Sequence, residues 1–283
     1  MKILTFDIED WFHILDNPRT SSPASWVKMP SRIEGGVERI LKLLSDTQQP
    51  ATFFCLGWIA EKYPQVIRAI VDDGHHIATH SHLHQLAYDQ TKKDFEADLW
   101  RSIDTLQQLS GKVVDTYRAP GFSITSKNLW AFEIMDKLGI KNDCSVFPAS
   151  RAHGGLAEYS VAAPSIIKYG SVQLRSLPIN TSKILGQNIV YSGGGYFRLL
   201  PSWYLGRRFM KDKYVMTYFH PRDFDPQQPM VPGLGPIRKF KSYVGLSGAY
   251  KKLESILQEN KFMNVNMAVK STDWNSVEKV VLQ

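Results

Sequence analysis

In the first half of the chain, short apolar runs alternate with longer segments whose apolar residues recur every three or four positions. The short runs are typical of buried strands, and the wider spacing is typical of helices with one buried face. This alternation predicts parallel strands joined by crossover helices. The predicted strands cover residues 2–7, 51–57, 75–80, 113–117 and 140–147.

The expected helices of this half cover residues 34–47 and 65–73, and two more begin after Thr91 and Ser126. Side-chain oxygens of Ser and Thr accept hydrogen bonds from the free backbone N–H groups that open a helix. Asp94 follows Thr91 by three residues, which comes close to a capping box.

The pattern becomes less regular after residue 148, and an aromatic, Pro- and Ser-rich segment at residues 8–31 is expected to be a surface loop. No repeat or linker divides the chain, so we expect a single domain over residues 1–283. The later elements are expected to be a hairpin at 165–180, a turn into a helix at 192–201, a strand at 214–220, a loop at 221–246, a helix capped by Ser247 and a strand at 261–267.

The net charge of +7 comes from scattered basic residues. Since no long basic run is present, we expect no nucleic-acid partner, although a positive field could favour an acidic glycan or an anionic surface. Cys55 and Cys144 lie in apolar runs, which predicts buried free thiols. No leader and no transmembrane segment is recognisable, so a cytoplasmic location is expected.

Five polar residues lie at or near the ends of predicted strands. A chain of 283 residues is long enough for one α/β barrel, and such barrels build their active sites at the carboxyl ends of the strands. One site is therefore expected where these residues meet: Asp7, His80, Arg118, Asp143 and His220.

His80 and His84 are four residues apart, so on a helical turn both imidazoles would lie on one face and could bind one metal ion. Catalytic zinc takes three protein ligands and keeps one position for water. Acids after the first strand offer the third ligand. Asp7 and Glu9 point to one side of an extended segment, and the spacing leaves Glu9 and Asp10 as alternatives.

Three further residues have predicted roles. Arg118 could hold a carboxylate bidentately, and the backbone N–H of Gly121 could face an oxyanion. His220 could be a general acid oriented by Asp223 or Asp225. The other histidines are weaker candidates, expected at the surface or behind the site: His13, His75, His76, His82 and His153.

Five segments occur in a characteristic order: TFDIED, HSHLH, RAPGF, NDCSVF and TYFHPRDFDP. Together they resemble the polysaccharide deacetylases of carbohydrate esterase family 4, the nodulation-factor deacetylase homology group, over roughly residues 1–225. The opening and the HPRDFDPQQP stretch resemble the branch associated with bacterial exopolysaccharide and surface-glycan synthesis.

The resemblance implies a distorted (β/α) barrel of about seven parallel strands and a divalent metal, usually zinc, held by one acid and two histidines. His80 and His84 match the metal histidines of the family. Asp7 matches the catalytic base, Arg118 the residue that orients it, and His220 the catalytic acid.

In most members a second acid follows the base directly, whereas Ile8 follows Asp7 here. Relatives with a spaced acid use the one two positions on, which implies Glu9 as the metal ligand, with Asp10 as the fallback. Asp143 matches the fourth family motif only loosely. The implied activity is removal of N-acetyl groups from a bacterial glycan or precursor. The alternatives are hydrolysis of a small cyclic amide and a non-catalytic, glycan-binding homologue.

Overall fold

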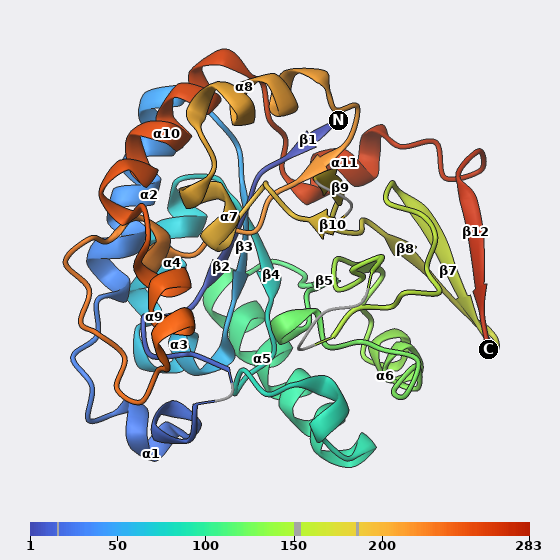
Figure 1. Cartoon of the computed structure of the whole chain (residues 1–283). Helices are drawn as coiled ribbons and strands as arrows, with labels where there is room; N and C mark the ends of the chain where they lie inside the picture. Colours follow the sequence, from blue (N-terminus) through green and yellow to red (C-terminus); the bar gives the residue numbers. More distant parts are fainter. Residues whose placement is uncertain (16, 150–153, 185–186) are drawn as a thin grey trace.

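The computed structural model describes residues 1–15, 17–149, 154–184 and 187–283 (Figure 1). Its strands are β1 Lys2–Ile3, β2 Thr5–Ile8, β3 Thr52–Cys55, β4 His76–Thr79, β5 Thr116–Tyr117, β6 Asn142–Asp143, β7 Ser165–Tyr169, β8 Val172–Ser176, β9 Ser182–Ile184, β10 Gln187–Ile189, β11 Val215–Met216 and β12 Glu278–Leu282.

Eight of these strands form one sheet in the order β12-β7-β8-β6-β5-β4-β3-β2. Neighbours pair in parallel except β7 and β8, the hairpin predicted from the sequence. A two-residue turn can join only antiparallel strands, because a parallel pair needs a long crossover. In Figure 1 this hairpin and β12 form the edge of the molecule where the chain ends.

Beyond β2 the sheet continues through short, irregular segments. β1 pairs in parallel with β11, and isolated parallel bridges join Phe6 to Phe219 and Gly193 to Tyr218. The side chain of Asn180, just past β8, accepts a hydrogen bond of 2.9 Å from a backbone N–H of β11. These contacts bring the far end of the sheet back towards β2, so the predicted α/β fold with a distorted barrel is confirmed.

The helices cover the outside of the barrel (Figure 1). Among the described residues, none is long and apolar enough to cross a lipid bilayer. The helices, with short 3₁₀ turns labelled η, are η1 Pro18–Thr20, α1 Pro23–Trp26, α2 Ile33–Thr47, α3 Gly57–Lys62, α4 Pro64–Asp72, η2 Ala87–Asp89, α5 Lys92–Ser110, η3 Pro120–Phe122, α6 Ala131–Lys137, α7 Gly194–Leu199, α8 Ser202–Lys211, η4 Pro221–Phe224, α9 Pro236–Tyr243, α10 Leu246–Glu259 and α11 Val265–Ser271.

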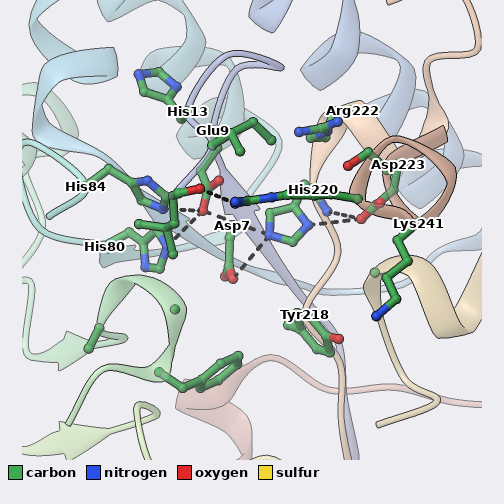
Figure 2. A pocket seen from close by; sticks show the side chains of 18 of the residues that line it. Asp7, Glu9, His13, His80, His84, Tyr218, His220, Arg222, Asp223 and Lys241 are labelled. Carbon is green, nitrogen blue, oxygen red and sulfur yellow. Dashed lines mark hydrogen bonds and ion pairs between the residues drawn. The ribbon is translucent and has the colours of Figure 1, made fainter. Parts of the chain in front are cut away.

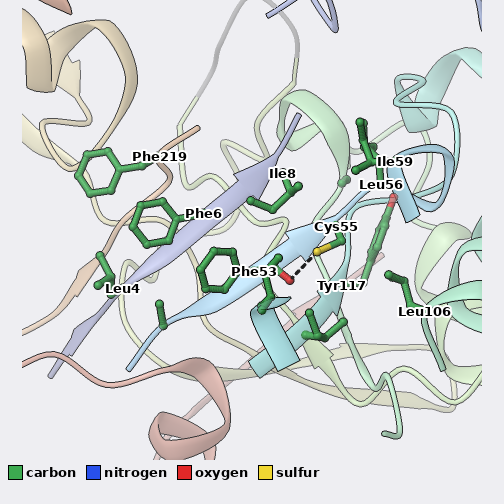
Figure 3. Close-up of a cluster of buried hydrophobic side chains, with 14 of the residues drawn as sticks. Leu4, Phe6, Ile8, Phe53, Cys55, Leu56, Ile59, Leu106, Tyr117 and Phe219 are labelled. Atoms are coloured by element: carbon green, nitrogen blue, oxygen red, sulfur yellow. Dashed lines mark hydrogen bonds between the residues drawn. The ribbon is translucent and has the colours of Figure 1, made fainter. Parts of the chain in front are cut away.

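The outer face of the first strands packs against the helices and holds the main core. Phe6 of β2 stacks on Phe53 of β3 at 5.3 Å between ring centroids, and Phe219 closes the cluster at 6.0 Å from Phe6 (Figure 3). Cys55 and Cys144 are buried free thiols, as predicted, and burial raises the pKa of both.

The predicted cap of α5 is confirmed, because the Thr91 hydroxyl accepts a hydrogen bond of 3.2 Å from the backbone N–H of Asp94. The predicted cap at Ser126 is wrong. The side chain of Asn128 accepts from the backbone N–H of Thr125 at 2.8 Å. This local polar turn keeps the backbone out of the helix until α6 begins.

Two predictions for the last third were also wrong. The N-cap of α10 is Gly245 rather than Ser247, with a backbone φ of 72°. Residues 261–267 were expected to be a strand, but α11 begins inside them because the Asn264 side chain accepts a hydrogen bond of 2.8 Å from an N–H three residues on.

Loops were also misjudged. Residues 221–246 contain η4 and α9. In the segment at 8–31, Trp11, Phe12 and Trp26 are buried rather than exposed. The indole N–H of Trp11 donates a hydrogen bond of 2.9 Å to a backbone carbonyl. Because these aromatic rings carry large apolar surfaces, burying them draws the loop down onto the end of the barrel.

Candidate metal centre and active site

The ends of β2 and β4 bring an acid and two histidines together (Figure 2). Glu9 Oε1 lies 3.0 Å from His80 Nε2 and 2.8 Å from His84 Nε2. All three side chains are buried. Burial would raise the pKa of the Glu9 carboxyl, but His84, His220 and His80 hold that pKa well below its usual range.

The two histidines do not share a helical turn, contrary to expectation. They lie on a tight loop in which Ser81 and His84 have φ values of 67° and 53°. Asp98 of α5 holds this loop by accepting from the backbone N–H groups of residues 82 and 83 at 2.7 and 2.9 Å. Gly57 is required opposite, because an added Cβ would lie 2.4 Å from the His82 ring. Tertiary contacts therefore aim the imidazoles.

The chemistry of this cluster fits a cation. His80 Nδ1 lies 2.7 Å from the backbone carbonyl oxygen of Arg118, which can only accept, so Nδ1 carries the hydrogen. In the neutral ring a lone pair on Nε2 then faces a carboxylate oxygen of Glu9 at 3.0 Å. Two acceptors that face each other need a proton or a metal between them. One carboxylate and two imidazoles, of which His80 is oriented by a backbone carbonyl, are a set that zinc accepts.

Asp10, the alternative ligand, points elsewhere. Its carboxylate accepts hydrogen bonds from the backbone N–H of Trp11 at 2.8 Å, the Ser31 hydroxyl at 2.5 Å and the backbone N–H of Arg32 at 3.1 Å. It thus braces the start of α2. Of the two acids that the sequence left open, the structure groups Glu9 with the histidines.

Beside this cluster, Arg118 Nη1 lies 2.6 Å from Asp7 Oδ1, and the Arg118 side chain is fully buried. The predicted bidentate contact is not formed. The same Nη1 also donates to the Thr5 hydroxyl at 2.8 Å, and Nη2 donates to the Thr217 carbonyl at 3.4 Å. The guanidinium also lies 4.0 Å from the Phe54 ring centroid. Asp7 is therefore held through one oxygen, and Oδ2 is directed elsewhere.

His220 faces that second oxygen. Its Nε2 lies 3.9 Å from Asp7 Oδ2 and 3.9 Å from Glu9 Oε1. Burial would lower the pKa of His220, but Glu9 and Asp223 outweigh burial and raise that pKa to about 9. A protonated imidazole at this position can act as an acid.

Asp223 is the acid that orients His220. Its Oδ2 lies 3.0 Å from His220 Nδ1, while Asp225 instead forms an ion pair with Arg32. Asp143 is buried on β6 and accepts from the backbone N–H groups of residues 145 and 146 at 3.1 and 3.3 Å, so it supports the turn after β6. Burial raises the pKa of Asp143 to about 6.

One cavity of about 320 Å³ is lined by six of these residues: Asp7, Glu9, His80, His84, His220 and Asp223. Arg118 and Asp143, which were expected at the same site, do not line it. Gly121, in η3 with a φ of 62°, and Tyr218 form part of its floor together with the acids and histidines. The sequence thus identified residues from both halves of the chain that the fold brings to a single mouth.

His13 was underrated. It is 3% exposed, lines the cavity, and its ring centroid lies 6.1 Å from that of His84. Its Nδ1 accepts a hydrogen bond of 2.9 Å from the Asp10 backbone N–H, and burial lowers its pKa to about 3, so the ring is neutral. The signal in the sequence that could have indicated a position at the site was that His13 follows Asp10, a candidate metal ligand, by only three residues. Three other histidines, His75, His76 and His82, lie outside the cavity lining. His153 lies outside the described residues.

Fold and cavity define the class of protein: an α/β barrel with an acid–histidine cluster at the carboxyl ends of its strands. Residues 4–142 match the family model "Polysaccharide deacetylase", and residues 144–270 match a domain of unknown function, DUF3473. The first of these segments belongs to the polysaccharide deacetylases of carbohydrate esterase family 4, so the resemblance seen in the sequence is confirmed.

Two named relatives align with part of the chain. A peptidoglycan deacetylase of Helicobacter pylori is 32% identical over 113 residues, which are 40% of this chain and 38% of the relative. A peptidoglycan-N-acetylglucosamine deacetylase of Bacillus cereus is 30% identical over 96 residues, 34% of this chain and 35% of the relative. The chain thus spans little more than a third of either relative.

Solved structures share the fold across the whole chain. A Mycobacterium smegmatis protein classed as a polysaccharide deacetylase superposes with a TM-score of 0.66 at 17% identity, covering 99% of this chain and 92% of that one. A family 4 pseudoenzyme from Bacillus anthracis gives a TM-score of 0.53 at 13% identity, covering 99% and 66%. At these identities the likeness concerns the fold alone.

Proposed function

We propose that this chain is a metal-dependent deacetylase that removes N-acetyl groups from a bacterial glycan or a glycan precursor. The observation that carries the proposal is the meeting of Glu9, His80 and His84 with Asp7 and His220 in one cavity. The two relatives act, by their names, on peptidoglycan, which supports an N-acetylated glycan as the substrate.

Glu9, His80 and His84 would hold the metal, and zinc is the ion that such a ligand set suits best. When bound, the ion supplies a Lewis acid that polarises the acetyl carbonyl and lowers the pKa of water.

The residues of the chain supply the proton transfers. Asp7, anchored through one oxygen by Arg118, takes a proton from the attacking water with the other. Gly121 lines the cavity, and its backbone N–H would donate to the oxyanion that forms on the carbonyl. His220, held by Asp223, gives its proton to the nitrogen as the C–N bond breaks, which releases acetate and an amino sugar.

The test is to replace His80 by Ala. Elemental analysis should then find no bound zinc, and acetate release from chitotetraose should be lost. His75→Ala removes a histidine outside the cavity lining and should keep both. Unchanged acetate release by the His80 variant would refute the assignment.

The wild-type protein separates the alternatives. Metal bound without acetate release would indicate a non-catalytic homologue. Hydrolysis of a small cyclic amide in place of the acetylated sugar would favour that activity instead.

A further inference from the structure

One wall of the cavity is cationic, and we propose that it binds an anionic group, a carboxylate or a phosphate, carried by the acetylated sugar. This inference rests on the proposed deacetylase function and narrows its substrate to acidic glycans. Arg222 of η4 and Lys241 of α9 form the wall. Figure 2 shows both on the side of His220 away from His80 and His84.

The carboxylates that line the cavity do not neutralise this wall, because each already has a partner. Among the residues that the structure describes, three acids line the cavity: Asp7, Glu9 and Asp223. Asp7 pairs with Arg118, and Glu9 pairs with His80 and His84. Asp223 pairs with His220 and Arg198, and His220 also lies 3.9 Å from both Asp7 and Glu9.

Arg222 has an unused donor. Its Nη1 donates to the backbone carbonyl oxygen of Trp11 at 3.3 Å. Its Nη2 is buried, and within the described ranges it has no hydrogen-bond partner. Buried guanidinium N–H groups are costly to leave unmatched, and a carboxylate or phosphate oxygen is the acceptor that suits them best. An anion in the cavity would supply it.

The backbone of Lys241 is held in place beside the cavity that Arg222 also lines. Within the described part of the chain, its ammonium forms no ion pair. Its backbone carbonyl accepts a hydrogen bond of 2.9 Å from Arg198 Nη2, and Arg198 Nη1 donates to the Ser242 carbonyl at 2.8 Å.

Arg198 also connects α9 to Asp223, which holds the proposed proton donor His220. Arg198 Nε lies 3.5 Å from Asp223 Oδ1, and Asp223 in turn holds His220. The backbone of Lys241 therefore keeps a fixed relation to the leaving-group side of the site. An anionic substituent on the acetylated sugar would lie between the two cations while the acetamido group faces Glu9 and the histidines.

The experiment compares matched substrates on the chain of residues 1–283. To test a carboxylate, chitotetraose is compared with a tetrasaccharide of alternating N-acetylglucosamine and N-acetylmuramic acid. To test a phosphate, N-acetylglucosamine is compared with its 6-phosphate. Acetate release provides kcat and KM, and calorimetric titration provides a Kd independent of turnover. The comparison with the larger preference identifies the anion.

For the preferred acidic substrate, Lys241→Met should raise KM about tenfold with little change in kcat, because the contact forms in the bound and transition states alike. Arg222→Gln should act in the same direction. Lys241→Arg keeps the charge and should restore binding. Lys239→Met, on the same helix but outside the cavity lining, is the matched control and should match the wild type.

Equal Kd values for neutral and acidic sugars would overturn the inference, as would an equal loss for both kinds of substrate in Lys241→Met. Acetate release without an acidic preference would leave the deacetylase proposal standing and remove this one. Preferential binding of the acidic sugar, with no acetate released from any substrate, would support the anion-binding wall and remove the deacetylase proposal.

Discussion

The two matched segments of the chain reach one cavity by different means. Residues 4–142 place their functional groups at the ends of regular parallel strands, as with Asp7 on β2 and His80 after β4. Residues 144–270 place His220 after a two-residue strand and hold it through Asp223 and Arg198. Strand register positions the first group, and a network of polar side chains positions the second.

This difference suggests that the two segments contribute different functional groups to the site. The regular segment carries the candidate metal ligands and the candidate base. The irregular segment, which matches a domain of unknown function, carries the candidate acid and the cationic wall. If both proposals hold, the second segment would complete the site and select the substrate.

The largest expected effect tests this difference between the segments. His220→Gln should lower kcat for acetate release by about 100- to 10,000-fold, because the amide cannot give a proton to the leaving nitrogen. Bound zinc should remain, as measured by elemental analysis, whereas His80→Ala should lose it. Loss of metal from the His220 variant would show that the two segments do not act separately.

Within the regular segment, Arg118→Met should destabilise the protein by about 3–5 kcal/mol, because it leaves the Asp7 carboxylate buried without its partner. Urea unfolding measures the loss. Arg101→Met breaks an exposed pair with Glu61 and should cost less than about 1 kcal/mol. Similar losses in the two variants would contradict the role given to burial.

A smaller effect should depend on pH. The pKa of Asp143 is about 6 in the folded protein, above its ordinary value of 3.8, so the folded state holds the proton more tightly than the unfolded chain. Ionisation therefore costs stability as pH rises from about 4 to about 6. Below pH 4, the free energy of unfolding of Asp143→Asn should equal that of the wild type. Above pH 6, the variant should be more stable than the wild type by about 2–3 kcal/mol. A constant difference across urea titrations at each pH would contradict the cause.

The smallest expected effect compares two helix starts. Thr91→Ala should cost about 1 kcal/mol, since its hydroxyl caps α5. Ser247→Ala is the matched control and should cost almost nothing, because the N-cap of α10 is Gly245. Thermal unfolding of both variants would reveal whether the cap predicted in the second segment has any role.

Prediction from sequence was most accurate where local pattern decides structure. The strands ending in Asp7 and preceding His80 and the cap at Thr91 follow from apolar runs and from short-range hydrogen bonds. It failed at 8–31 and 221–246, where loops are shaped by contacts with distant segments. Arg222 donates to the Trp11 backbone carbonyl, and Arg198 donates to that of Lys241. No local pattern reveals such contacts.

The amino-acid sequence by itself determined the strand-and-helix rhythm, the order of the five segments and the residue types available for chemistry. Only the tertiary structure shows that Glu9 rather than Asp10 contacts the histidines, and that Asp223 rather than Asp225 contacts His220. It also shows that His80 and His84 both point at Glu9 from a loop and not from a helix. The reason is physical. Neighbouring acids differ little in sequence, but in the folded chain one faces the imidazoles while the other meets backbone N–H groups, and only three-dimensional packing decides which.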